Sequence, residues 1–186
     1  MIDVPAGVSD DVFDRELKRG TVIRTQYRFP DGSTRNKYLI VLNHNVSGPA
    51  IIFVFTTSRT EFYKKYPQFN LDILALPAGT VSFFAKETVI DCRQVYKLSR
   101  DQLKRNFQEG LLQFAGELSS DYLTRVDQII RKSRFISPDD KKYILGGPCP
   151  SSKDLTIYNH QQKDLEHCDY FKGNKFFKEW LDIIAR

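Results

Sequence analysis

Cationic and hydroxyl side chains stand at the ends of two successive apolar segments. The stretch RNKYLIVLNHN, residues 35–45, begins with Arg35 and Lys37. The stretch AIIFVFTTS, residues 50–58, ends with Thr57 and Ser58. Arg35 or Lys37 at one strand end, beside Thr57 and Ser58 at another, could form a cationic, hydrogen-bonding pocket. Such a pocket suits chemistry in which negative charge develops on phosphate oxygens.

Metal-free cleavage of RNA is one reaction of this kind. A base takes the proton of the 2′-hydroxyl, an acid supplies a proton to the leaving oxygen, and donors stabilise the phosphorane. His44 follows the first segment and titrates near neutrality when unperturbed. A six-residue strand spans roughly 20 Å, so His44 and Arg35 cannot face one phosphate from that strand. We therefore expect the site at the start of the strand, and the sequence leaves the general base unassigned.

Each of these residues also has a purely structural interpretation. Arg35 and Lys37 could be the solvated shoulder of a hairpin, and Thr57 and Ser58 could cap the loop that follows. His44 could be an ordinary residue of a surface loop. These alternatives stay open at the level of sequence.

Aromatic and basic residues alternate in RTEFYKKYPQFN, residues 59–70. Single-stranded RNA is bound by cations along its backbone and by aromatic rings on which bases stack. We therefore predict an RNA-binding surface that adds two basic residues from a later segment: Arg59, Tyr63, Lys64, Lys65, Arg93 and Lys97. The alternative is that the aromatic rings pack beneath the loop and the cations only increase solubility.

The charge distribution favours a polyanionic partner. The net charge is +5, with acidic residues gathered in 3–16 and basic residues in 93–105 and 131–134. No apolar run approaches the roughly 20 residues that span a bilayer, so we expect no membrane association. Three widely spaced cysteines argue for a reducing compartment, which makes the cytoplasm the expected location.

The segment from 20 to 96 predicts about six short strands joined by tight turns. This spacing favours an α+β chain built on a small antiparallel barrel or rolled sheet. The expected strands are residues 21–29, 37–43, 50–56, 72–76, 81–84 and 88–95.

Helices are expected after these strands. Ser99 and Gln102 form a capping box before an apolar helical period that runs from Leu103 to Leu118, with Gly110 as a weak point. A second helix is predicted to start at Ser119 or Ser120, and a third covers the aromatic end of the chain. Cys149, His160, His167 and Cys168 lack the spacing of a structural zinc site, so no metal or other cofactor is expected.

The order of these segments resembles the MazF/PemK-like toxins of bacterial toxin–antitoxin systems. That family opens with an Arg-Gly-Asp-Val/Ile strand and continues with an Arg-Pro-x-Leu-Val-x strand that ends in a polar residue. An apolar strand ending in Thr or Ser, a basic strand and a helix of Val-Asp-x-x-Ile/Leu pattern follow. The resemblance covers residues 19–133, and it leaves an acidic leader, 1–18, and an extension with a linker and helices, 134–186, outside. The matching stretches are RGTV (19–22), KYLIVLN (37–43), IIFVFTTS (51–58), VSFFAKETVIDCRQVYKLSRDQL (81–103) and YLTRVDQII (122–130).

The resemblance implies an SH3-like β-barrel with helices and a metal-free endoribonuclease that cuts single-stranded RNA. It also implies a homodimer, neutralised by a cognate antitoxin that covers the RNA groove. Family members carry a catalytic Arg followed by Pro, whereas this chain has Arg35-Asn36-Lys37, so either cation could fill the role. The rival hypothesis is an SH3-like module without catalysis that binds nucleic acid or a protein, because small barrels serve many functions.

Overall fold

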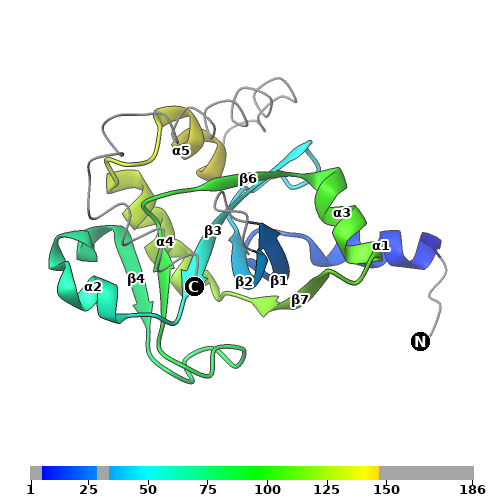
Figure 1. Cartoon of the computed structure of the whole chain (residues 1–186). Coiled ribbons are helices and arrows are strands. Elements are labelled where there is room, and N and C mark those ends of the chain that lie inside the picture. The colour runs from blue at the N-terminus through cyan, green and yellow to red at the C-terminus, as the bar shows by residue number, and fades with distance from the viewer. Residues whose placement is uncertain (1–5, 29–33, 147–186) are drawn as a thin grey trace.

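An antiparallel sheet organises the chain. The computed structural model describes residues 6–28 and 34–146. The strands follow the order β4-β5-β3-β2-β1-β7, and β6 pairs separately with β3 (Figure 1). The strands are β1 (Thr21–Arg28), β2 (Thr34–Val41), β3 (Ala50–Thr57), β4 (Ile73–Leu76), β5 (Thr88–Asp91), β6 (Tyr96–Ser99) and β7 (Leu112–Glu117).

The expectation of an α+β chain with an antiparallel sheet is confirmed. All of the strand pairs in the described residues are antiparallel. Within 6–28 and 34–146 no strand pairing joins β4 to β7, so the sheet is open instead of closing into a barrel.

Strand β3 lies at the centre of the sheet. One edge pairs with β2, while the other edge pairs with β6 at Ala50–Phe53 and with β5 at Thr56 and Thr57. Side chains alternate between the faces of a strand. Accordingly, Phe53 and Phe55 belong to one buried cluster, and Ile52 and Val54 belong to the other. An unbroken apolar run is what a strand buried on both faces requires.

The helices cover the sheet and fill both clusters. Phe13 of α1 enters the first cluster, whereas Val126 and Ile130 of α4 enter the second. In Figure 1, α1 lies beside α3 near β7, at the end of the molecule opposite to α2. The helices are α1 (Ala6–Glu16), α2 (Glu61–Lys65), the 3-10 helix η1 (Pro67–Asp72), α3 (Arg100–Gln108), α4 (Ser120–Lys132) and α5 (Pro138–Ile144).

Two expected elements were wrong. The strand expected at 81–84 is a turn region. The helix expected to continue to Leu118 ends with α3 at Gln108, because Gly110 adopts a left-handed φ of 72° and turns the chain. The residues that follow form β7, whose Leu112 pairs with Thr25 of β1. The strand expected at 88–95 is shorter, because β5 ends at Asp91 and a separate strand, β6, begins at Tyr96. With 81–84 lost and β6 and β7 gained, the sheet has seven strands in the described residues, where about six were expected.

The acidic leader forms a helix that packs on the rest of the fold. Phe13 is completely buried, and its ring lies 5.8 Å from that of Phe107 and 6.0 Å from that of Phe114. Asp14 forms an ion pair with Arg100 of α3. Residues 6–17 thus contribute to the first core cluster. The linker and the helix expected at the end of the chain lie largely in 147–186, outside the described residues.

Replacing Phe13 with Ala tests this contribution. A buried Phe truncated to Ala loses about 3 to 5 kcal/mol of unfolding free energy, since apolar contacts vanish and a cavity remains. We expect urea denaturation of the full chain to show a loss of that size. Arg15→Ala is the matched control, because its side chain is 70% exposed, and it should change stability by less than about 0.5 kcal/mol. Equal midpoints for Phe13→Ala and the control would contradict the packing of α1.

Candidate functional site

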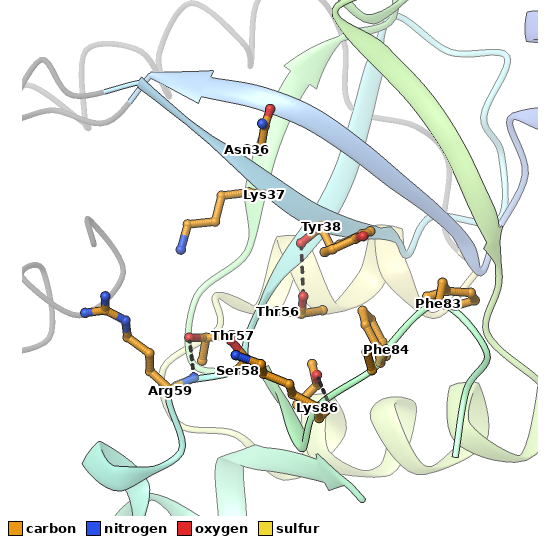
Figure 2. A pocket seen from close by; sticks show the side chains of 12 residues that line it. Asn36, Lys37, Tyr38, Thr56, Thr57, Ser58, Arg59, Phe83, Phe84 and Lys86 are labelled. Atoms are coloured by element: carbon orange, nitrogen blue, oxygen red, sulfur yellow. Dashed lines mark hydrogen bonds between the residues drawn. The ribbon is translucent and has the colours of Figure 1, made fainter. Parts of the chain in front are cut away.

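A pocket with a volume of about 380 Å³ opens between the start of β2, the end of β3 and the segment before β5 (Figure 2). Its walls combine cations, hydroxyl groups and aromatic rings. The residues that line it are Asn36, Lys37, Tyr38, Thr56, Thr57, Ser58, Arg59, Phe83, Phe84, Ala85, Lys86 and Thr88. The sequence-predicted Lys37, Thr57 and Ser58 therefore meet at one site, together with Arg59.

The antiparallel register explains this meeting. Leu39 of β2 pairs with Phe55 of β3, and the hydroxyl of Thr56 donates to the carbonyl of Tyr38 at 3.4 Å. Going backward along β2 corresponds to going forward along β3. Lys37, the fourth residue of β2, consequently lies beside Thr57, the last residue of β3.

Arg35 and Lys37 have different places. Lys37 lines the pocket, and Arg35 does not. Arg35 lies two residues earlier on β2, where it pairs with Tyr27 of β1. The positive charge of Arg35 still lowers the pKa of Lys37. Of the two cations that the sequence offered, Lys37 is therefore the one in the pocket wall. Which of them acts in catalysis stays a prediction.

The amine of Lys37 has a lowered pKa. Burial disfavours its charged form, and the positive charges of Arg35 and Arg59 add to the effect, so the pKa falls to about 8. A group with a pKa near neutrality can both accept and donate protons under physiological conditions. Lys37 thus has the property that a general base in this position would need.

The charged side chains that line the pocket are all positive. Lys37, Arg59 and Lys86 all line it, and no carboxylate is among the described residues of its wall. Figure 2 places Lys37, Thr57 and Arg59 on one side and Phe83 on the other. Clustered cations and hydroxyl donors bind phosphate oxygens well. This arrangement suits a ligand with a phosphate beside Lys37 and Arg59 and an apolar or aromatic group near Phe83.

Local hydrogen bonds fix the hydroxyl groups. The oxygen of Thr57 accepts from the backbone N–H of Arg59 at 3.2 Å, which turns the chain after β3. A hydroxyl that accepts in this way can still donate its own proton. The hydroxyl of Thr88 donates to the carbonyl of Lys86 at 2.9 Å on the facing wall. The capping role that the sequence allowed for Thr57 and its place in the pocket therefore coexist.

Glu87 joins the two walls. Its carboxylate accepts from the hydroxyl of Thr60 at 3.1 Å and from the amine of Lys64 at 3.3 Å. Thr60 and Lys64 follow Arg59 in the chain, whereas Glu87 follows Lys86. The segments that carry two pocket cations are thus held together, and Lys64, predicted to bind RNA, forms one of these bonds.

The aromatic side is also fixed by packing. The ring of Phe84 packs edge-on against two neighbouring rings. Its centroid lies 5.5 Å from that of Tyr38 and 4.7 Å from that of Phe83. A Cβ atom at Gly116 of β7 would lie 2.9 Å from the ring of Phe83, so only glycine lets the ring lie this close. The positions of these rings depend on β7, a strand that the sequence analysis missed.

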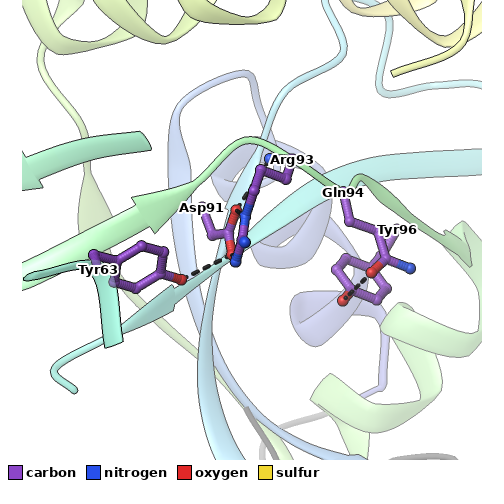
Figure 3. A network of polar contacts seen from close by, with 5 residues as sticks. All are labelled: Tyr63, Asp91, Arg93, Gln94 and Tyr96. Carbon is purple, nitrogen blue, oxygen red and sulfur yellow. Dashed lines mark hydrogen bonds and ion pairs between the residues drawn. The ribbon is translucent and has the colours of Figure 1, made fainter. Parts of the chain in front are cut away.

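Tyr63 and Arg93 belong to a buried network, although they were predicted to bind RNA (Figure 3). Tyr63 donates to Asp91 at 2.8 Å, and Arg93 binds both oxygens of the same carboxylate at 2.9 and 2.6 Å. The guanidinium also lies 4.2 Å from the ring centroid of Phe69. Tyr63 is 3% exposed and the Arg93 side chain 9%, so both act in the structure as supports of α2 and η1.

The titration of this network follows from its contacts. Burial alone would raise the pKa of Asp91, but the hydrogen bonds and charge of Arg93 hold it below its usual value. Burial and the charge of Asp91 raise the pKa of Tyr63. The network therefore contains an ionised Asp91, an ionised Arg93 and a neutral Tyr63 at neutral pH.

The basic run at 93–105 is largely neutralised by carboxylates. Lys97 pairs with Asp140 of α5 at 2.6 Å, with side chains only 8% and 9% exposed. Lys104 pairs with Asp10 of α1 at 3.0 Å, and Arg100 pairs with Asp14. Partners that lie this far away in the sequence were not visible in it. The structure thus engages Lys97 in a buried ion pair that ties β6 to α5, instead of presenting it to a partner.

The remaining candidate residues lie apart from the pocket lining. Lys65 stands over the ring of Tyr66 at 5.1 Å. Burial and the charge of Arg19 lower the pKa of His44, which does not line the pocket. Sequence reasoning missed Lys86, Phe83 and Phe84, because the stretch SFFAKE was divided between a predicted strand and the turn that followed it.

No protein-family model matches the chain, and no match to it is found among curated proteins. The resemblance to MazF/PemK-like toxins therefore stays a prediction. Among the described residues, no group of three or more His, Cys, Asp or Glu side chains could hold a metal ion. Within the same residues no helix has the length and apolar character to cross a membrane. Cys149, His160, His167 and Cys168 lie outside the described residues.

Direct titration of Lys37 tests the electrostatics of the site. We expect NMR of the lysine side chains to give Lys37 a pKa of about 8. Arg35→Gln removes a like charge and should raise this pKa, because protonation of Lys37 becomes less costly. Arg125→Gln, on the exposed face of α4, is the control and should leave it unchanged. A Lys37 that titrates near 10.5, or that ignores Arg35→Gln, would refute the description.

Proposed function

We propose that this protein is a MazF/PemK-like endoribonuclease that cuts single-stranded RNA at the pocket without a metal ion. The observation that carries the proposal is the gathering of Lys37, Thr57, Ser58 and Arg59 around one cavity, with no carboxylate among the described residues that line it. The proposal includes the SH3-like relationship of the sheet, a cytoplasmic homodimer and a cognate antitoxin that covers the pocket.

The proposed reaction is transesterification. Neutral Lys37 takes the proton of the 2′-hydroxyl, and the 2′-oxygen forms a bond to phosphorus while the bond to the 5′-oxygen breaks. Arg59 and the hydroxyls of Thr57 and Ser58 donate to the phosphorane oxygens, where charge stabilisation has the largest effect. The Lys86 ammonium supplies the proton of the leaving 5′-oxygen. The products are a 2′,3′-cyclic phosphate and a 5′-hydroxyl end.

The aromatic side of the pocket supports a single-stranded substrate. Tyr38 and Phe83 are partly exposed on the lining. Bases can stack on such rings only when they are unpaired and splayed from a helix. A phosphate near Lys37 and a base near Phe83 would use both sides of the pocket.

The second candidate is a binding module without catalysis. It is favoured by the presence of Lys37 in the pocket wall, because a lysine lacks the planar, bidentate geometry of the catalytic arginine that family members carry. It is also favoured by Thr57, whose oxygen already caps the following loop. Such a module would hold a phosphate-containing ligand or an acidic protein segment in the same pocket.

Cleavage of a long single-stranded RNA in EDTA separates these candidates. We expect wild type to give discrete fragments with 5′-hydroxyl ends. Lys37→Ala should lower the rate by about 10²–10⁴-fold, the usual contribution of a general base. Thr57→Ala should lower it by roughly tenfold or more through loss of a donor. Arg35→Ala should lower it less than Lys37→Ala, since Arg35 does not line the pocket.

Lys142→Ala is the matched control, because Lys142 of α5 is an exposed lysine that neither lines the pocket nor belongs to the predicted RNA-binding surface. It should cut RNA at the wild-type rate. Intact RNA with wild type, together with retained RNA binding, would rule out the nuclease and support the binding module.

The pH dependence distinguishes two roles of Lys37. As a base it acts in its neutral form, so the cleavage rate should rise with pH and level off above about 8. As a fixed cation it would act in its protonated form, and the rate would fall above that pH. Single-turnover rates between pH 6 and 10 measure this. A Lys37→Arg protein stays charged throughout and should lack the rise.

A further inference from the structure

The pocket combines a reactive amine with groups that bind a phosphate. Lys37 supplies the amine, Arg59 and Lys86 supply positive charge, and Thr57 and Ser58 supply hydroxyl donors. We propose that Lys37 is a modification site at which acyl phosphates transfer their acyl group to the amine. The ligand class is thus a small carboxylic–phosphoric anhydride, in which the phosphate and the reacting carbon are bonded through one oxygen.

The first requirement is an amine that reacts at neutral pH. Only the neutral form attacks a carbonyl, and burial with Arg35 and Arg59 brings the pKa of Lys37 to about 8. At pH 7.5 about a quarter of Lys37 is then neutral, against about a thousandth of an ordinary lysine. A less basic amine is also a weaker nucleophile. With the Brønsted dependence known for thiols, the lower pKa reduces the reactivity of the neutral amine by roughly tenfold. A net advantage of roughly tenfold remains.

The second requirement is a means of holding the leaving group. Arg59 offers a planar fork that matches two phosphate oxygens, and Lys86 offers a mobile point charge. The bonds of Glu87 to Thr60 and Lys64 keep the two segments together. A phosphate bound there would leave the attached acyl carbon within the same small cavity as Lys37. Holding two reactants together in this way raises the rate further.

The step is balanced without another reactant. The nitrogen of Lys37 forms a bond to the acyl carbon, and the bond from that carbon to the bridging oxygen breaks. The departing phosphate leaves as hydrogen phosphate and carries the proton that the nitrogen loses. The product is a neutral amide on Lys37.

Acylation would remove both the basicity and the charge of Lys37. It would therefore silence RNA cleavage, and this consequence rests on the proposed function. The modification itself depends only on the geometry and charge of the pocket. The two proposals can consequently fail separately.

The test uses the full chain and acetyl phosphate at pH 7.5, with site-resolved mass spectrometry over time. Lys64, whose side chain is 66% exposed, and the exposed Lys132 serve as internal references. We expect Lys37 to be acetylated more than about tenfold faster than either, because amine reactivity and phosphate binding both favour it. Inorganic phosphate should slow the reaction at Lys37 and leave the references unchanged. Equal rates at the three lysines, or a preference that phosphate does not reduce, would overturn the proposal.

A second acyl donor separates phosphate binding from simple amine reactivity. The N-hydroxysuccinimide ester of acetic acid carries no phosphate, so its reaction at Lys37 should be insensitive to inorganic phosphate. Lys86→Gln should slow acetylation of Lys37 by acetyl phosphate several-fold more than acetylation by the ester. Equal slowing of both donors would overturn the role of the pocket in holding phosphate. RNA cleavage, assayed on the unmodified protein, reports on the proposed function alone.

Discussion

The burial of β3 is the constraint on which the site depends. This strand is paired along both edges and packed on both faces, so its position and register are set by the core. Its last residues leave the core at Thr57, where the side chain becomes only partly buried. The hydroxyl groups at the end of β3 are therefore held in place by the sheet. The pairing of β2 with β3 places Lys37 beside them. A pocket built on strand ends is held more firmly than one built on loops alone.

The same burial gives the pocket its electrostatic character. A cation near a buried sheet loses hydration, and further cations nearby make its charge more costly still. Elsewhere the protein neutralises its basic residues: Lys97 has Asp140 and Arg93 has Asp91. At the pocket, Lys37, Arg59 and Lys86 gather without a carboxylate in the described lining. Like charges gathered in this way repel one another, and binding an anion would relieve the repulsion. Sites of this sort are often functional.

The sequence predicted the elements whose signals are local, and it missed those that depend on distant partners. Strands β1, β2 and β3 follow from apolar composition and the turns between them, and α4 follows from its apolar period. Strand β7 resembled a continuing helix, because its pairing with β1 is invisible in the local pattern. The candidate pocket was predicted through Lys37, Thr57 and Ser58, although β2 begins at Thr34 and Lys37 therefore lies within the strand instead of at its end. The basic run at 93–105 was misjudged for the opposite reason: carboxylates from other elements neutralise it.

A lysine at position 37 has a specific physical consequence for the pocket. An arginine there would stay charged at any physiological pH and could act only as an electrostatic donor. A lysine in the same desolvated position, with Arg35 two residues earlier on the strand, has a pKa of about 8 and so can exchange protons. The remaining cations, Arg59 and Lys86, can then supply the fixed charge that a phosphate needs. Lys37 therefore adds a titratable group to a pocket in which an arginine would have added only a further fixed charge.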